Sequence, residues 1–109
     1  MKLPTEIFGD VVVVHAPEEM SGDNAANVVA CLTTLERSRV ILDLDGTESF
    51  DSEGLAALLE SQESLRESDG DLKISTANPV NRKILEITRL DQQLEVFDSV
   101  IDAVKSFAV

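Results

Sequence analysis

The residues with the clearest chemical potential are Asp51 and Ser52, which follow an apolar run ending at Leu44 and a short polar loop. Side-chain oxygens of Asp and Ser accept hydrogen bonds from the free N–H groups in the first turn of a helix. We therefore expect Asp51 to cap a helix, Ser52 to be its first residue, and Glu53 to complement the positive end of the helix dipole. By residue type alone, capping is a sufficient reason for all three.

The same position would suit a phosphate group on Ser52. A serine in the first turn lies at the helix surface, near N–H groups that favour anions. Phosphorylation would add about −1.5 to −2 charges beside Asp51 and Glu53. A partner docked on this surface would then meet repulsion and desolvation, so the hydroxyl is well placed to act as a switch.

The other reactive side chains form no recognisable catalytic or metal-binding pattern. The sequence has one histidine, His15, one cysteine, Cys31, and five isolated glycines. It contains no phosphate-binding glycine loop, no nucleophile elbow and no alternating Asp/Asn calcium loop. A Ser-His-Asp triad made of Ser52, His15 and a carboxylate would rest on that single histidine. We expect a binding protein rather than an enzyme, with no cofactor and no metal.

Acidic residues outnumber basic ones by 21 to 9, which gives a net charge of −12. Such a surface repels nucleic-acid phosphates and anionic membranes, so we expect neither as a partner. A basic, arginine-bearing protein surface fits better. The N-terminus has no signal-like apolar stretch, and no apolar run reaches transmembrane length. We therefore expect a cytoplasmic protein.

The chain of 109 residues suits one domain, residues 1–109, in which strands alternate with helices. Strands are predicted at residues 3–8, 11–15, 39–44, 72–76 and 94–97, and helices at residues 23–37, 52–67, from 79 and from 99. Gly9 and Asp10 predict a tight hairpin. The valines at 11–14 predict a strand buried on both faces, and the alternation at 72–76 predicts a half-covered one.

Helix ends and inward faces follow from the same patterns. Ser21 or Asp23 is expected to cap the first helix, Gly70 to end the second, and Asn78 to cap the third. The positions expected to face the core, by their three- and four-residue spacing, are Ala25, Val28, Val29, Leu32 and Leu35, then Leu55, Leu58, Leu59 and Leu65, then Val80, Ile84 and Ile87, and finally Val100, Ile101, Val104 and Phe107.

Four short motifs occur in a definite order. Residues 51–55 read Asp-Ser-Glu-Gly-Leu, residues 78–79 Asn-Pro, residues 87–90 Ile-Thr-Arg-Leu and residues 97–99 Phe-Asp-Ser. Together they resemble the STAS domain of bacterial anti-sigma factor antagonists, in which a buried strand with acidic residues at its end precedes Asp-Ser-Ser/Thr-Gly-Leu at a helix start. The resemblance extends over about residues 11–107, nearly the whole chain.

This resemblance implies a STAS-like α/β fold, a mixed sheet of about four to five strands with helices packed largely on one side. It also implies an anti-sigma factor antagonist that binds a serine-kinase anti-sigma factor when unphosphorylated. The kinase would phosphorylate Ser52 and release the complex, and a PP2C-type phosphatase would reverse that step. The partner-binding residues implied in this way are Asp51, Ser52, Glu53, Gly54, Ala56 and Ala57.

Two places depart from the family pattern. Glu53 stands where the family usually has Ser or Thr, and it puts a permanent negative charge in the docking region, which could weaken phosphorylation or change the choice of partner. Residues 16–23 lack the family's G-x-L/I-D motif, which would fit a different or diverged partner.

Two other classes of protein share some of these features. Acyl carrier proteins are small, acidic and carry Asp-Ser at a helix start, but they are all-helical with Leu after the serine, where Glu53 stands here. A STAS domain can also serve as an unphosphorylated scaffold or adaptor subunit of a signalling or lipid-transport assembly. Glu53 and the altered loop at residues 16–23 are compatible with that second role.

Overall fold

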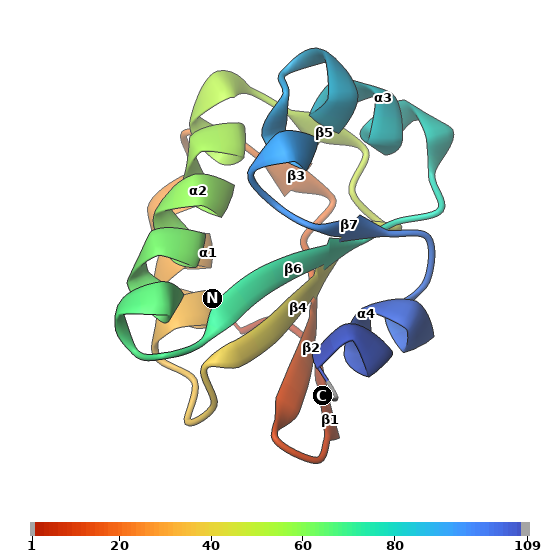
Figure 1. Ribbon diagram of the computed structural model, residues 1–109. Coiled ribbons are helices and arrows are strands. Elements are labelled where there is room, and N and C mark those ends of the chain that lie inside the picture. Colours follow the sequence, from red (N-terminus) through yellow and green to blue (C-terminus); the bar gives the residue numbers. More distant parts are fainter. Residues whose placement is uncertain (1, 108–109) are drawn as a thin grey trace.

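The computed structural model describes residues 2–107, which form a five-stranded sheet, a two-stranded sheet and four α-helices (Figure 1). The strands are β1 (Thr5–Phe8), β2 (Val11–His15), β3 (Glu19–Met20), β4 (Arg39–Asp43), β5 (Ser49–Phe50), β6 (Asp71–Ser75) and β7 (Val96–Phe97). The helices are α1 (Ala25–Thr33), α2 (Ser52–Glu67), α3 (Pro79–Ile87) and α4 (Val100–Phe107), with a short 3-10 helix, η1 (Leu90–Gln92).

The larger sheet has the strand order β1-β2-β4-β6-β7. β1 and β2 form the predicted hairpin, and Gly9 adopts the left-handed conformation (φ 63°) that its two-residue turn requires. β2, β4, β6 and β7 are parallel, so the sheet is mixed. Parallel strands share one carboxyl edge, and the loops that lead to the surroundings of Ser52 leave the sheet there.

Helices cover both faces of this sheet (Figure 1). Val12 and Val14 of β2 join the apolar cluster beneath α1 and α2, whereas Val11 and Val13 join a second cluster with Phe107 of α4. The valine run is therefore buried on both faces, as predicted. The predicted mixed α/β sheet of the STAS type is confirmed, and α4 is the helix that covers the opposite face.

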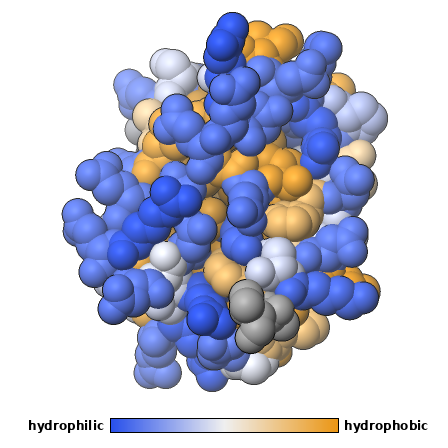
Figure 2. Space-filling view, in the orientation of Figure 1, coloured by the Kyte–Doolittle hydropathy of each residue, from blue (hydrophilic) through white to orange (hydrophobic). Residues whose placement is uncertain are grey.

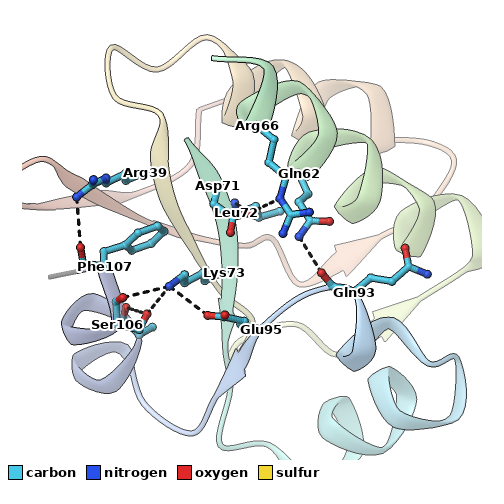
Figure 3. A network of polar contacts seen from close by, with 11 residues as sticks. Arg39, Gln62, Arg66, Asp71, Leu72, Lys73, Gln93, Glu95, Ser106 and Phe107 are labelled. Atoms are coloured by element: carbon cyan, nitrogen blue, oxygen red, sulfur yellow. Dashed lines mark hydrogen bonds and ion pairs between the residues drawn. The ribbon is translucent and has the colours of Figure 1, made fainter. Parts of the chain in front are cut away.

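Lys73 of β6 anchors α4 to the sheet (Figure 3). Its side chain is largely buried, and its Nζ donates a hydrogen bond to Ser106 Oγ (2.8 Å) and forms an ion pair with Glu95 (3.1 Å). The same Nζ lies 4.2 Å from the centre of the Phe107 ring, a cation–π distance. The prediction of a half-covered strand at residues 72–76 is wrong, because α4 covers this lysine and β6 is buried on both faces.

The first helix is shorter than predicted, Ala25–Thr33 rather than residues 23–37. Neither Ser21 nor Asp23 is its N-cap, which is Asn24. The Asn24 Oδ1 instead accepts from the Ser21 N–H (3.0 Å), so it stabilises the turn before the helix. That turn follows directly on the short strand β3, which the sequence pattern did not indicate and which delays the start of α1.

The second helix spans Ser52–Glu67, as predicted, and ends in a Schellman motif. The residue in the left-handed conformation is Asp69 (φ 62°), not Gly70. Gly70 contributes its N–H, which donates to the Leu65 carbonyl oxygen (2.9 Å). A Cβ at Gly70 would collide with the Ser38 carbonyl group, so close packing on the neighbouring segment explains the glycine.

The inward face of α3 differs from the prediction. Asn78 caps the helix, as expected, but Val80 and Ile87 are 64% and 69% exposed, while Asn81 and Leu85 are buried. The buried Asn81 amide explains this rotation, because its Nδ2 donates to two backbone carbonyls of the loop after β4. In α4, Ile101 is 64% exposed, and Ala103 takes the core position beside Phe107.

Polar side chains dominate the face of the molecule seen in Figure 2, with apolar side chains visible in patches between them. This surface agrees with the net charge of −12. Within residues 2–107, no helix has the length and apolar character needed to cross a membrane.

The α3 register can be tested with a matched pair of substitutions. Leu85→Ala should lower the free energy of unfolding by about 2–5 kcal/mol, because it leaves a cavity in the core. Ile87→Ala should change it by less than about 0.5 kcal/mol, because that side chain is exposed. Urea denaturation followed by circular dichroism measures both, and equal costs would mean that Ile87 faces the core.

Candidate functional site

The site is built around the carboxylate of Asp51, the N-cap of α2. Asp51 has an extended backbone, and its Oδ1 accepts from the Gly54 N–H (2.9 Å) while its Oδ2 accepts from the Gly22 N–H (3.0 Å). These bonds, that from Gly22 first, favour the ionised form and lower the pKa of the Asp51 carboxyl from its ordinary 3.8. Both hydrogen bonds to the Asp51 carboxylate are therefore formed at neutral pH and weaken only in acid.

Gly54 allows the first turn of α2 to rest directly on β3. It is buried, and a Cβ at this position would collide with the Met20 carbonyl group. The backbone of Asp51 joins the same contact, since its N–H donates to the Met20 carbonyl oxygen (3.1 Å). A close backbone approach, rather than helix propensity, therefore explains the glycine in the Asp-Ser-Glu-Gly-Leu motif.

Glu53 lies over the loop between β3 and α1. Its carboxylate occupies the space that a Cβ on Gly22 would need. The lack of a side chain at Gly22 leaves room for the Glu53 carboxylate, and the lack of one at Gly54 lets α2 approach Met20 closely. Among residues 2–107 Glu53 has no ion-pair partner, so its charge is uncompensated.

Ser52 is the first residue of α2 and is exposed. Asp51 provides the side-chain cap, as the sequence predicted, and Ser52 does not. Within the described part of the chain, the Ser52 hydroxyl takes part in no hydrogen bond. This hydroxyl is therefore unengaged and accessible from solvent.

The remaining predicted site residues divide into two groups. Glu53 and Ala56 are exposed, whereas Gly54 and Ala57 are buried and can act only by positioning the others. Ala56 and Ala57 line a shallow groove of about 390 Å³ between α1 and α2. Its floor consists of small apolar side chains, and the carboxylates of Glu53 and Glu60 stand at its edge.

Two supports of the site were not found from the sequence. The two-residue strands β3 and β5 pair in parallel just before α2, and strands this short carry no periodicity. The second support is Asn81 of α3, whose Nδ2 donates to the carbonyls of Leu44 and Thr47 (2.9 Å each) and holds the loop that leads to Ser52. A polar residue within the apolar pattern of α3 was the one available signal.

No group of three or more His, Cys, Asp or Glu side chains within residues 2–107 is placed to hold a metal ion. His15 is engaged with Glu6 and Asp43 at the end of β2. The chemistry that this site offers is therefore that of one exposed hydroxyl at a helix N-terminus, between two carboxylates.

Comparison with known proteins agrees with this architecture. The profile of the STAS domain matches residues 2–103, so the chain belongs to the STAS domain family, as its motifs predicted. A Thermotoga maritima protein that carries the provisional name of anti-sigma factor antagonist is 24% identical over 106 residues, 94% of this chain and 94% of that protein.

Solved structures share the fold at low identity. The crystal structure of the Thermotoga maritima protein superimposes with a TM-score of 0.83, at 23% identity, over 95% of this chain and 92% of that one. A sulfate transporter family protein from Wolinella succinogenes gives a TM-score of 0.79, at 21% identity, over 93% of this chain and 87% of that one. The phosphorylated form of the Bacillus cell fate determinant SpoIIAA gives a TM-score of 0.70, at 16% identity, over 97% of this chain and 99% of that one.

The close approach at Gly54 can be tested by adding one methyl group. Gly54→Ala should lower the free energy of unfolding by about 1–3 kcal/mol, because the new Cβ overlaps the Met20 carbonyl. In a helix without such a contact, the same change would stabilise by roughly 1 kcal/mol. Gly46→Ala is the matched control, since no atom lies within 4 Å of its added Cβ. A stabilising Gly54→Ala would contradict the contact.

Proposed function

We propose that this protein is an anti-sigma factor antagonist. In its unphosphorylated form it binds a serine-kinase anti-sigma factor, and phosphorylation of Ser52 by that kinase releases it. A PP2C-type phosphatase then restores the binding form. Membership of the STAS family and similarity to named antagonists support a regulatory binding protein rather than an enzyme.

The observation that carries the proposal is the state of the Ser52 hydroxyl, which is exposed and unbonded at the first residue of a 16-residue helix. In many helices a serine at such a position would itself be the cap, and its oxygen would be occupied. Here Asp51 accepts the capping hydrogen bond from Gly54 and leaves the serine oxygen available. The helix start is therefore stable whether or not Ser52 is modified.

The expected effect of a phosphate follows from its neighbours. It would add about −1.5 to −2 charges between the carboxylates of Asp51 and Glu53, and Asp51 already holds the N–H of Gly54. The phosphate would therefore gain little stabilisation inside the molecule and would project its charge outward. A partner surface packed over Ser52 would have to desolvate this charge, which favours dissociation.

The exposed residues around Ser52 indicate the kind of partner surface. Asp51 and Glu53 are negative, and the chain as a whole has a net charge of −12. A partner that presents arginine or lysine to them would be attracted to this face, which suits a protein and not nucleic acid or an anionic membrane. We propose that the chain acts in this way as a single domain, residues 1–109, in the cytoplasm.

Phosphorylation at Ser52 is the direct test. Incubated with ATP and its cognate serine-kinase anti-sigma factor, the protein should gain one phosphate, and Ser52→Ala should gain none. Intact-mass spectrometry measures this. Ser49→Ala is the matched control, because Ser49 is exposed in β5 only three positions away.

Binding to the same kinase should follow the charge at Ser52. Ser52→Asp should bind more weakly than wild type, while Ser52→Ala should bind at least as well, since the hydroxyl makes no hydrogen bond within the described structure. Isothermal titration calorimetry gives both affinities. Identical behaviour of wild type and Ser52→Ala in both assays would refute the switch.

A second candidate function is that of an unphosphorylated STAS scaffold or adaptor, in a signalling or lipid-transport assembly. Glu53 favours it, because an unpaired carboxylate already lies beside Ser52 where the antagonist pattern has Ser or Thr. The similar fold of a sulfate transporter family protein fits this wider use of STAS domains. In this alternative the partner would bind irrespective of any phosphate.

Replacement of Glu53 separates the two candidates. If the site is phosphorylated, Glu53→Gln should raise the kinase's kcat/KM several-fold, because it removes a negative charge next to the incoming γ-phosphate. Glu63→Gln, exposed farther along α2, should leave kcat/KM unchanged. The scaffold role would be supported if neither variant is phosphorylated and Glu53→Gln alone weakens binding of the partner.

A further inference from the structure

His15 stands at the end of β2 between two carboxylates on the neighbouring strands. Its Nδ1 is 3.0 Å from Asp43 Oδ2 on β4, and its Nε2 is 2.7 Å from Glu6 Oε1 on β1. Among residues 2–107 these are the charged groups in contact with the imidazole, and no cation contacts it. Three adjacent strands are thus joined through one ring.

Both contacts can be hydrogen bonds only when the ring is protonated. An ionised carboxylate only accepts, and a neutral imidazole has one N–H to donate. In the neutral ring, the second nitrogen would place its lone pair opposite a carboxylate oxygen at 2.7 or 3.0 Å. Loss of the proton therefore removes one of the two bonds and replaces it with repulsion.

The two carboxylates are held with unequal strength. Asp43 is only 12% exposed, and its Oδ1 also accepts from the Asp45 N–H (2.9 Å). Asp45 directs its own Oδ1 to the Ala77 N–H and does not contact the ring. The Glu6 side chain is 56% exposed, and its carboxylate has no other hydrogen bond within the described residues. A neutral His15 would keep its N–H for Asp43 and lose Glu6.

Loss of Glu6 matters because β1 is weakly held. All four of its residues are exposed, and it is the edge strand of the larger sheet. Besides its ladder with β2, it is retained by the packing of Leu3 on the core and by the His15 N–H, which donates to the Pro4 carbonyl oxygen (2.9 Å). His15 thus attaches β1 through both its backbone and its side chain.

We propose that the Glu6–His15–Asp43 cluster is a proton-operated clamp, which holds the edge strand β1 on the sheet when His15 is protonated and loosens it when His15 is neutral. Opening would expose the backbone N–H and C=O groups along the edge of β2, which β1 now covers. The clamp is independent of Ser52 and of the proposed antagonist function.

The direction of the pH effect follows from the two partners. The hydrogen bond with Glu6 is the largest cause that raises the pKa of His15 above its ordinary 6.5, and the charge of Asp43 adds to it against partial desolvation. A group whose pKa is higher in the closed state stabilises that state fully below 6.5, and the contribution disappears as the pH rises through the raised value. Strand β1 should therefore stay paired with β2 in mild acid and open more often in mild alkali.

The test uses the full chain and its single histidine, whose imidazole signals need no assignment. NMR titration from about pH 5.5 to about pH 9 should give a His15 midpoint above 6.5. The protection of the His15 and β1 amides against hydrogen exchange should fall over the same pH range. It is expressed relative to the protection of β4 amides, which cancels the pH dependence of the intrinsic exchange rate. The loss should be about tenfold for each pH unit by which the wild-type midpoint exceeds that of the Glu6→Gln variant, because opening of β1 removes Glu6 and leaves Asp43 beside the ring.

Two variants complete the design. Glu6→Gln should lower the His15 midpoint and flatten the pH dependence of β1 protection, and it should fold, because Glu6 is largely exposed. His15→Gln should abolish that dependence. The clamp is wrong if the wild-type midpoint lies at or below 6.5, if β1 protection stays constant while His15 titrates, or if Glu6→Gln retains the full wild-type response.

Discussion

The carboxylate of Asp51 joins two backbone segments, by accepting from the N–H group of Gly54, three positions ahead in the chain, and from that of Gly22, 29 positions before it. One oxygen caps α2, and the other holds the loop that leads from β3 to α1. Because both oxygens are used in this way, neighbouring Ser52 needs no structural role. The contact of Glu53 with Gly22 and the groove between α1 and α2 lie beside the segments that this side chain joins.

Around this junction, polar groups add to the apolar packing of Met20 and Leu44 at the carboxyl edge of the sheet. Asn81 fixes the loop after β4 through two carbonyls, and the Asp45 carboxylate accepts from the Ala77 N–H (2.7 Å). Hydrogen bonds of this kind define a loop conformation more narrowly than apolar contacts do, because they depend on direction. The proposed switch at Ser52 would benefit from such rigid support.

Ionisable side chains meet at the carboxyl end of β2. There His15 contacts both Glu6 and Asp43, and the Ala16 N–H donates to the Asp43 carbonyl oxygen (2.9 Å) before the chain continues toward Gly22. The histidine cluster therefore stands at the base of the loop that Asp51 holds at its far end. On the face of the sheet that α4 covers, Lys73 pairs with Glu95 and lies against the rings of Phe97 and Phe107. In so acidic a chain, these few cations hold elements together.

Much of the fold was determined by local sequence. The hairpin at Gly9, the valine run of β2, the start of α2 at Ser52 and the Asn78 cap depend on residues that are close in the chain, so turn chemistry and periodicity predict them. The motif around Ser52 also predicted the STAS family. Tertiary structure decided the rest. The face of α3 was set by the distant carbonyls that Asn81 reaches, and the short strands β3 and β5 exist only through pairing with each other. The hydrogen bond from the Gly22 N–H to Asp51 was likewise not predictable, because hydrogen bonds between distant segments leave no periodic trace in sequence.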